Sequence, residues 1–426
     1  LLKAGRLARH EGDGARLAAA ALANNSGTFS VFGGRDTERL EMLEAAIAAG
    51  SGNGKQALLL GTLANELTYS GDFDHRREIV DDALAAARAS GDPSLHLHVL
   101  NLVFYPLWVP ETIDERVAMT EESLELVGHV DDPLTQFWTA VAAQTNLLQA
   151  GRVAESDPHL ERSAVLADRL AQPALQWRAR HIAATRQLLV GDPDVAEALA
   201  REGLELGNRA GEPVAGFYFK SQEMCLHWLR GTMADLSARI KGDKQRPPAA
   251  TASLCHIFAE SGRDDEARTL LHREAEVGFS DLPYDPTLIA SLAMFAEAAI
   301  LIRDRESATH LHTLLAPYAG QMGFDGVTAM GSLEHYLGGL ATILGHDDEA
   351  VERLTRSRDV HAAMPAPFYE ARSRHQLAVA LLARDRDGDA EAAGTELRHA
   401  VAIAERHRYR MVHLRAAQLL ANTNGV

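Results

Sequence analysis

Histidine is frequent in this chain, with 19 residues, and some of these side chains stand close together in the sequence. Imidazole and thiolate groups bind zinc when several converge, which within one helix requires spacings of three or four residues. His96 and His98 are two residues apart, so on a helix their rings point to different faces. Cys255 and His256 form one isolated pair. We therefore expect no metal site.

Nucleophilic and phosphate chemistry also lack recognisable motifs. The sequence contains no Gly-x-Ser-x-Gly elbow, no His-Glu-x-x-His pair and no Gly-x-x-x-x-Gly-Lys-Ser/Thr phosphate loop. Carboxylates are abundant, but runs such as 264–266 are typical of helix N-termini, where the helix dipole favours negative charge. We expect no catalytic residues, no cofactor and no enzymatic activity. An enzyme whose pocket is built on this scaffold stays open, because fold does not dictate function.

A mixed column of aromatic and hydrogen-bonding side chains is the best candidate for a binding surface. It begins five residues after each of four regularly spaced prolines and continues three and seven residues further on, along one helical face. A core column should not alternate in this way, because burying an unpaired polar group costs about 1–3 kcal/mol. Aromatic residues and arginine are also the usual hot spots of interfaces. We predict that the following residues line a ligand-binding groove: His98, Asn101, Tyr105, Trp138, Arg178, His181, Tyr218 and Ser221.

The four prolines define the elements that must position this column. They recur every 40 residues, and glycines follow three of them at a distance of 18 residues. The prolines are Pro93, Pro133, Pro173 and Pro213, and the glycines are Gly151, Gly191 and Gly231. Proline is favoured at the first position of a helix, and glycine just past its end. The clearest unit therefore predicts one helix from Pro133 to Gly151 and a second over about 154–170. The apolar column Leu97, Phe137, Trp177 and Phe217 is predicted to form the core between such helices.

A fixed period of this length is the signature of a solenoid built from helix pairs. We predict an all-α fold, a right-handed superhelical α-solenoid of antiparallel helix pairs, with about ten pairs in 426 residues. The phase breaks after Gly231, where a polar, proline-rich stretch follows. We therefore predict a regular array over 1–240, an irregular linker or bend over 241–252 and a second array over 253–426. Helix-start turns near residues 262, 304, 345 and 388 mark this second array.

Charge and cysteine content restrict the class of protein. The chain has 42 Lys and Arg against 59 Asp and Glu, a net charge of −17, whereas nucleic-acid-binding surfaces are basic. Two cysteines exclude a disulfide scaffold and agree with a reducing compartment. We find no signal peptide and no apolar stretch long enough to span a membrane. We expect a cytoplasmic protein that binds neither nucleic acid nor membrane, and, since residue 1 is leucine, a piece of a longer chain.

The helix-start turns of the second array resemble those of the tetratricopeptide repeat. In that repeat the second helix of each pair begins at a conserved alanine, which Ala267, Ala308 and Ala350 match. The period of 40 departs from the standard 34 and resembles a variant with longer helices. The resemblance implies that the first helix of each pair lines the concave face.

A closer resemblance covers nearly the whole chain. Four segments carry it: 66–72 (ELTYSGD), 108–116 (WVPETIDER), 314–320 (LLAPYAG) and 336–340 (YLGGL). They resemble the C-terminal helical-repeat region of large bacterial, often actinobacterial, transcriptional regulators. Those proteins carry a signal-transduction ATPase module and often a LuxR-type helix-turn-helix, winged-helix or cyclase domain. Because the phosphate loop is absent here, the resemblance implies the sensor or scaffold part.

Three hypotheses for function follow. The first is a binding module that captures a peptide, a protein segment or a small effector in its groove and so controls an attached regulatory ATPase. The second is a structural scaffold that oligomerises through its faces, which includes a homodimer. The third is an enzyme with a pocket built on the repeat scaffold. Neither the ligand nor the pathway is identified by the sequence.

Overall fold

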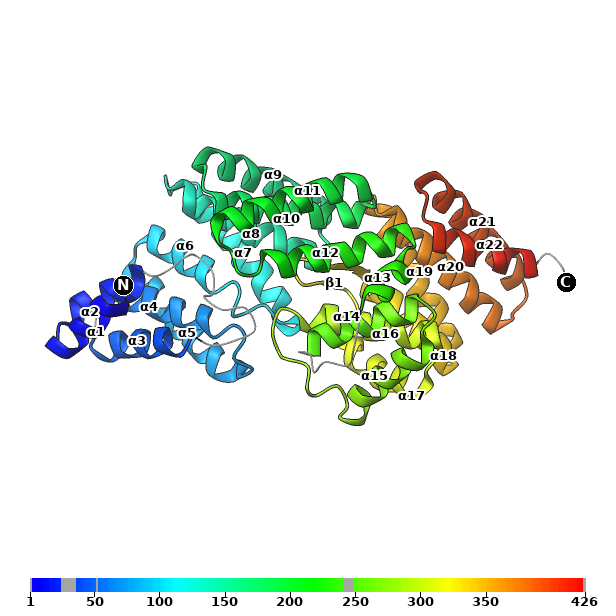
Figure 1. Cartoon of the computed structure of the whole chain (residues 1–426), viewed down its shortest axis with the longest axis horizontal. Coiled ribbons are helices and arrows are strands. Elements are labelled where there is room, and N and C mark those ends of the chain that lie inside the picture. Colours follow the sequence, from blue (N-terminus) through cyan, green and yellow to red (C-terminus); the bar gives the residue numbers. More distant parts are fainter. Residues whose placement is uncertain (1, 24–35, 51–52, 241–247, 424–426) are drawn as a thin grey trace. The chain divides into compact units, whose positions relative to one another are not determined.

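The prediction of an all-α helical-repeat fold is confirmed. The computed structural model describes residues 2–23, 36–50, 53–240 and 248–423. In these residues it contains 22 α-helices, two short 3-10 helices and one two-stranded β-hairpin (Figure 1). Most helices pack against the next helix along the chain, as expected for a repeat of helical hairpins. None of the helices described is both long and apolar enough to cross a bilayer.

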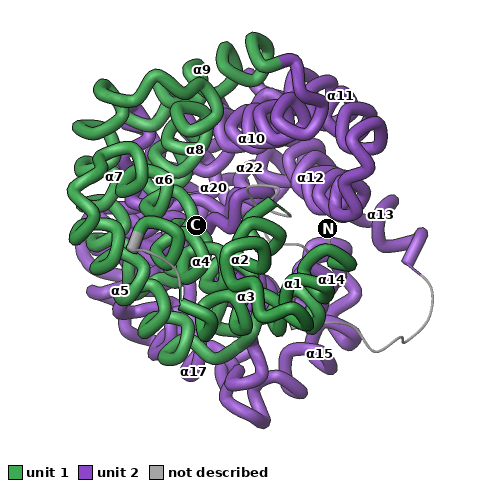
Figure 2. Tube along the Cα trace, turned by 90° about the vertical axis from the view of Figure 1, so that its left-hand side faces the viewer, with its two compact units in different colours: residues 1–147, 155–170, 283–286 green, residues 148–154, 171–282, 287–426 purple. Residues whose placement is uncertain are grey.

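The chain divides into two compact units, drawn in green and purple in Figure 2. Unit 1 comprises residues 1–147, 155–170 and 283–286, and unit 2 comprises residues 148–154, 171–282 and 287–426. The predicted arrays on either side of 241–252 are a different division of the chain and stay a prediction. Of that predicted linker, residues 241–247 lie outside the described part, and the rest belongs to a helix.

Unit 1 is a series of antiparallel helices. Its helices are α1 (Leu2–Glu11), α2 (Gly14–Ala23), α3 (Thr37–Ala48), α4 (Asn53–Glu66), α5 (Phe73–Ser90), α6 (Pro93–Leu102), the 3-10 helix η1 (Pro110–Thr112), α7 (Ile113–Val127), most of α8 (Pro133–Gln149) and most of α9 (Val153–Leu170). The segment between α6 and η1 is irregular. The sequence around Pro110 suggests that this proline ends the helix, but α6 ends earlier, at Leu102, and Pro110 begins η1.

Unit 2 continues the helical series and adds the hairpin. Its helices are α10 (Pro173–Val190), α11 (Pro193–Ala210), α12 (Ala215–Arg230), α13 (Met233–Arg239), α14 (Pro248–Glu260), α15 (Asp264–Glu276), α16 (Leu288–Ile302), α17 (Arg305–Leu315), η2 (Ala316–Tyr318), α18 (Leu333–Leu344), α19 (Asp347–Ala363), α20 (Pro367–Arg384), α21 (Asp389–His407) and α22 (Arg410–Thr423). Its strands, β1 (Met322–Phe324) and β2 (Ala329–Ser332), are antiparallel.

The proline and glycine columns act as the sequence predicts, with one exception. Helices α6, α8 and α10 begin at their prolines, and the glycines at 151, 191 and 231 adopt the left-handed conformation, with φ between 68° and 79°. The clearest predicted pair matches α8 and α9 closely. Pro213 is the exception, because α12 begins two residues later, at Ala215. The sequence Phe32-Gly33-Gly34 suggests a further turn of this kind, and it lies outside the described residues.

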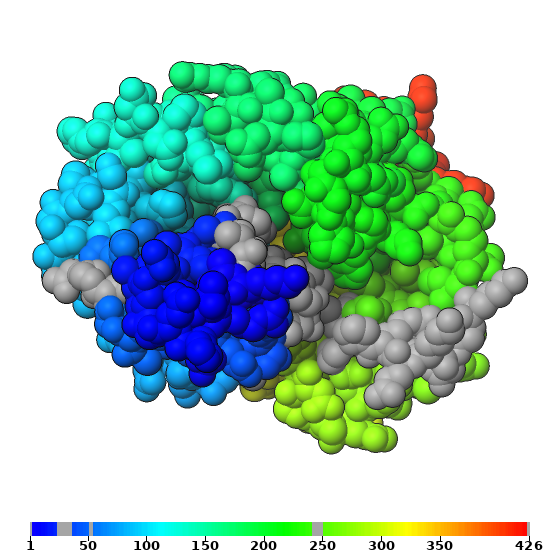
Figure 3. All heavy atoms as spheres, turned by 60° about the vertical axis from the view of Figure 1, so that its left-hand side comes forward, coloured from blue at the N-terminus to red at the C-terminus, as the bar shows by residue number. Residues whose placement is uncertain are grey.

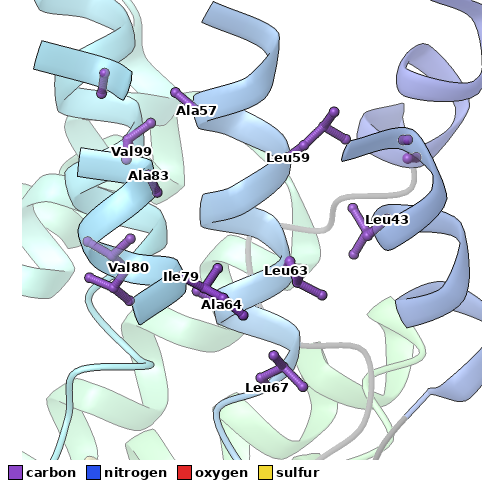
Figure 4. Close-up of a cluster of buried hydrophobic side chains, with 14 of the residues drawn as sticks. Leu43, Ala57, Leu59, Leu63, Ala64, Leu67, Ile79, Val80, Ala83 and Val99 are labelled. Atoms are coloured by element: carbon purple, nitrogen blue, oxygen red, sulfur yellow. The ribbon is translucent and has the colours of Figure 1, made fainter. Parts of the chain in front are cut away.

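Small and branched apolar side chains fill the space between the helices of unit 1. In Figure 4 Leu59 and Leu63 of α4 face Leu43 of α3, and Ala64 of α4 lies against Ile79 of α5. A leucine or isoleucine side chain stabilises the fold by roughly 1.5–3 kcal/mol when it is fully removed from water. The core of unit 1 is therefore a thin layer between successive helices, as the alanine-rich composition indicates.

Close approach of helices in unit 2 depends on a glycine. A Cβ atom added to Gly207 of α11 would lie 2.5 Å from the Cβ of Ala215 and 2.9 Å from the Trp177 ring. Only glycine lets α11 approach α10 and α12 this closely. In the space-filling view the green atoms of α12 lie directly beside those of α11 (Figure 3).

Candidate functional site

The eight predicted groove residues fall into both compact units. Unit 1 contains four of them: His98 and Asn101 of α6, Tyr105 just after α6, and Trp138 of α8. Unit 2 contains the other four: Arg178 and His181 of α10, and Tyr218 and Ser221 of α12. Each unit is therefore considered by itself. Whether any of the eight contacts a ligand stays a prediction.

In unit 1 these residues have different surroundings. His98 is exposed and lines a cleft of about 440 Å³ with Leu58 and Thr135. The Asn101 amide donates to the carbonyl oxygen of Thr135 at 3.2 Å and to the hydroxyl of Thr139 at 3.1 Å, which ties α6 to α8. Asn101 therefore has a structural contact within the unit, while His98 is the residue available to a ligand.

The two aromatic candidates of unit 1 pack among other rings. Tyr105 is buried, with its ring centroid 4.6 Å from that of Phe104 and 6.0 Å from that of Trp108. Trp138 is half-buried, edge-on to Phe137 at 5.2 Å. Aromatic pairs at these separations add about 0.5–1.5 kcal/mol beyond the area that they bury. Tyr105 therefore contributes to the core rather than to an exposed groove wall.

In unit 2 three of the predicted residues form one buried cluster. The His181 ring lies 5.2 Å from Trp177 and 5.0 Å from Tyr218, and the Arg178 guanidinium lies 4.9 Å from the centre of the Trp177 ring. Nη1 of Arg178 is 3.4 Å from Nε2 of His181. Burial, followed by the nearby Arg178 charge, holds the pKa of His181 well below its usual range, so this imidazole is neutral. The fourth residue, Ser221, donates only to the carbonyl oxygen one turn earlier, that of Phe217, at 3.3 Å.

The expectation that a mixed column must be exposed is therefore not met in unit 2. Polar side chains are tolerated inside when they find partners there. The Gln222 amide donates to the carbonyl oxygen of His181 at 2.7 Å and to the hydroxyl of Thr185 at 2.9 Å. These bonds join α12 to α10 across the buried cluster.

Phe217 corrects the predicted core column. Leu97, Phe137 and Trp177 are buried, but Phe217 is 45 % exposed. The delayed start of α12 moves the packing by one residue, so that Tyr218 faces Trp177 instead, at 5.6 Å. The sequence does not show this shift, because Pro213 stands at the expected distance of 40 residues from Pro173 although α12 begins only at Ala215.

The β-hairpin occupies the inner side of the helices of unit 2. Every residue of β1 and β2 is buried, and β2 contacts α10, α16, α18 and α19. Side chains from four helices bind the hairpin backbone. The hydroxyl of Thr185 donates to the carbonyl oxygen of Val327 at 3.0 Å, the hydroxyls of Tyr369 and Tyr336 donate to those of Ala329 and Met330, and the backbone N–H of Ser332 donates to Nε2 of His361 at 2.9 Å.

The sequence analysis missed this hairpin, although its glycines give a signal. Gly331 has φ 82°, and a Cβ added there would lie 2.5 Å from Cδ1 of Tyr369. A Cβ on Gly323 would lie 2.9 Å from the Cβ of Met330. Glycines at 320, 323, 326 and 331 interrupt the helical pattern between α17 and α18, and such spacing is more typical of turns and short strands than of helices.

A buried chain of hydroxyl and imidazole groups lies next to the hairpin. Because Nε2 of His361 accepts from the backbone, its neutral ring carries the proton on Nδ1, which donates to the hydroxyl of Ser373 at 3.0 Å. Ser373 also lies 3.1 Å from Nδ1 of His335, whose Nε2 is 3.9 Å from Glu297. The order Ser-His-Glu is that of a hydrolytic triad. Ser373 is completely buried, however, so the arrangement as it stands orders the core and does not expose a nucleophile.

Glu297 begins a buried group of charges in unit 2. Nη2 of Arg372 lies 2.5 Å from Oε2 of Glu297, and the guanidinium stacks over the Trp228 ring at 4.4 Å. The indole N–H of Trp228 donates to Glu260 at 2.8 Å, and Arg415 binds the other oxygen of Glu260 at 2.9 Å. Two carboxylates thus balance two guanidinium groups.

His256 lies beside this group of charges. It is fully buried against Trp228, with ring centroids 4.7 Å apart, and among the described residues neither of its ring nitrogens has a hydrogen-bond partner. Burial lowers its pKa, so that the ring is neutral. Burial opposes the ionisation of Glu260, but the charge and the hydrogen bonds of Arg415 hold the pKa of Glu260 below its usual range. The buried charges of this group are balanced, so removing one of them is expected to lower the stability of unit 2 strongly.

No cluster of three or more His, Cys, Asp or Glu residues that could hold a metal ion is found in the described part of the chain. Both cysteines are buried, and burial raises the pKa of Cys225 to about 12. As it stands, Cys225 is therefore a small apolar side chain and not an activated thiol.

Comparisons with known proteins give little further information. No family model matches the sequence, and no curated protein matches it. A solved structure titled "Circular tandem repeat protein with novel repeat topology and enhanced subunit contact surfaces" is 14 % identical, over 100 % of this chain and 94 % of that one, with a TM-score of 0.15. A score this low carries no argument, so the assignment to the helical-repeat class rests on the helices described above.

Proposed function

We propose that this chain is a binding module that holds an extended segment of a partner protein against the inner faces of its helices. The observation that carries this proposal is the way in which unit 2 holds its own hairpin. Hydroxyl and imidazole groups from four helices bind carbonyl and N–H groups of the hairpin backbone. Backbone groups are common to all peptides, so this chemistry suits an extended segment of varied sequence.

In unit 2 the predicted groove residues Arg178, His181 and Tyr218 are buried, and the hairpin binds Thr185, one turn after His181 on α10. A partner therefore requires another surface, and the cleft of unit 1 at His98 offers one. Its walls combine the apolar Leu58, Leu95 and Val130 with polar residues, next to the N-termini of α6 and α8; the polar residues besides His98 are Asp92, Ser94, Asp131, Asp132 and Thr135. The three aspartates suit a segment that carries basic side chains. The net charge of −17 favours a basic or neutral partner over an acidic one.

The resemblance to bacterial regulators gives the finer proposal. In that setting the chain is the cytoplasmic sensor or scaffold part of a transcriptional regulator, and partner binding shifts the population of an attached ATPase module between two states. Mass spectrometry of the native polypeptide tests this: peptides of an ATPase module joined to this chain are expected. A native polypeptide without such a module would remove the regulator proposal but not the binding module.

The binding proposal is tested on an array of random twelve-residue peptides probed with the full chain. We expect selected peptides to bind with micromolar affinity and to lose at least about tenfold in affinity on His98→Ala, because hot-spot truncations cost more than 1 kcal/mol. His129→Ala is the matched control, since His129 is also an exposed histidine of unit 1 but does not line the cleft. No selective binding, or equal loss in both variants, would show that the cleft is not the site.

A further inference from the structure

Four turns of unit 2 meet around one cleft of about 690 Å³. They are the α10–α11 turn at Gly191, the end of α12 at Arg230, the α19–α20 link at Pro365 and the α21–α22 turn at residues 406–409. The hydroxyl of Tyr409 donates to the carbonyl oxygen of Gly191 at 2.9 Å, which joins segments 218 residues apart in sequence. Figure 1 shows α12 in green close to α20 and α22 in orange and red.

The packing of Tyr409 fixes the shape of this cleft. Its ring packs edge-on against Phe368 at 5.2 Å, and the His407 ring stacks on it at 5.5 Å with an interplanar angle of 11°. A Cβ on Gly191 would lie 2.0 Å from the Tyr409 hydroxyl, so only glycine allows this contact. The α21–α22 turn is therefore held in one place, which favours a preformed site.

Only one of the three arginines that line the cleft forms an ion pair among the described residues. Arg230 is neutralised by Asp194 at 2.8 Å and by Glu197 at 2.7 Å. Arg406 and Arg408 are exposed, and their guanidinium groups make no hydrogen bond or ion pair in the described structure. Most other arginines of unit 2 have carboxylate partners, as expected for a chain with a net charge of −17. One acid remains in the cleft, Asp192, and its carboxylate accepts the N–H of Val195 as the cap of α11.

Apolar side chains form another part of the lining. They are Val190, Leu229 and the three prolines Pro193, Pro365 and Pro367. A volume of this size is typical of sites for small ligands, which combine apolar walls with a few polar groups that fix orientation. Two guanidinium groups that line one cleft suit a carboxylate or a phosphate, which each can bind in a bidentate manner.

We propose that this cleft binds a small organic anion, with its carboxylate or phosphate held by Arg406 and Arg408 and its apolar part against the proline wall. The site is separate from the peptide-binding surface proposed above. The α21–α22 turn carries the two arginines, and α10, α12 and α20 supply the wall. A ligand bound here bridges segments from the two ends of unit 2.

Isothermal titration calorimetry of the full chain with phenyl phosphate and with benzoate tests the proposal and separates the two anion classes. We expect saturable binding of at least one probe, with the preferred class binding more tightly. Arg406→Gln/Arg408→Gln should lower the affinity at least about tenfold, because each charge-assisted pair contributes more than a neutral hydrogen bond.

The matched control is Arg303→Gln/Arg398→Gln, which removes the same charge. Arg398 is another exposed residue of α21, and Arg303 ends α16 in the left-handed conformation, as Arg408 ends α21. The control variant should bind the probe like the unaltered chain, and circular dichroism should show both variants folded. Absence of saturable binding at millimolar probe, or equal loss in both variants, would overturn the proposal. Failure here leaves the binding of peptides at His98 unaffected.

Discussion

The ion pair between Arg372 and Glu297 should be the most sensitive point in the interior of unit 2. The two side chains are 8 % and 3 % exposed and lie 2.5 Å apart. Replacing Arg372 by methionine keeps much of its volume but leaves the Glu297 carboxylate without its charged partner. Breaking a buried pair in this way costs about 3–5 kcal/mol. Loss of the stacking on Trp228 adds about 1 kcal/mol.

The sum of these two effects, about 4–6 kcal/mol, is comparable to the whole stability of a small domain. We expect Arg372→Met to increase hydrogen exchange in α16 and α20 by two or more orders of magnitude, measured by mass spectrometry under native conditions. This readout is local, because a chain with two compact units need not unfold in one step. Helices of unit 1, such as α4, should exchange as before.

Two further variants test the reasoning. The double variant Arg372→Met/Glu297→Leu removes both charges and should be more stable than Arg372→Met alone, since an apolar pair can replace a buried ion pair at little cost. Arg386→Met removes an exposed pair with Asp348 and should cost less than about 1 kcal/mol. If Arg372→Met cost no more than this control, or the double variant were the less stable, the pair would not have the proposed role.

Three other predictions concern the hairpin and the α12 register. Gly331→Ala should destabilise unit 2 by more than about 2 kcal/mol, because the methyl group meets a buried ring, whereas Gly345→Ala, with similar φ but open space, should cost about 1 kcal/mol in thermal unfolding. Burial lowers the pKa of His361 from 6.5 to about 3, so its contribution to stability is present above pH 6.5 and declines as pH falls toward 3. His361→Gln should flatten that part of a urea-denaturation pH profile, and an unchanged slope would contradict the neutral acceptor role. By urea denaturation, Tyr218→Ala should lower the free energy of unfolding by about 3 kcal/mol and Phe217→Ala by less than about 1 kcal/mol. A larger loss for Phe217→Ala would instead support the predicted core position of Phe217.

The sequence by itself determined the class of fold and many of the helix boundaries. Pro133 and Gly151 limit α8 because a proline ring presets the first helical turn and a glycine readily adopts the left-handed conformation that ends it. These are local effects of single residues on the backbone, so they can be read without knowing what the helix packs against. The acidic turns at 264 and 347 mark helix starts for the same kind of reason.

Only the tertiary structure decided which of the candidate residues are buried. Arg178, His181 and Tyr218 form a spatial group as predicted, but the group is buried within unit 2. Arg372 and Glu297 are 75 residues apart in sequence, and Tyr409 and Gly191 are 218 apart. Burial and long-range pairing depend on which segments pack together, and the 40-residue period contains no information about an inserted hairpin or about a helix that begins two residues late.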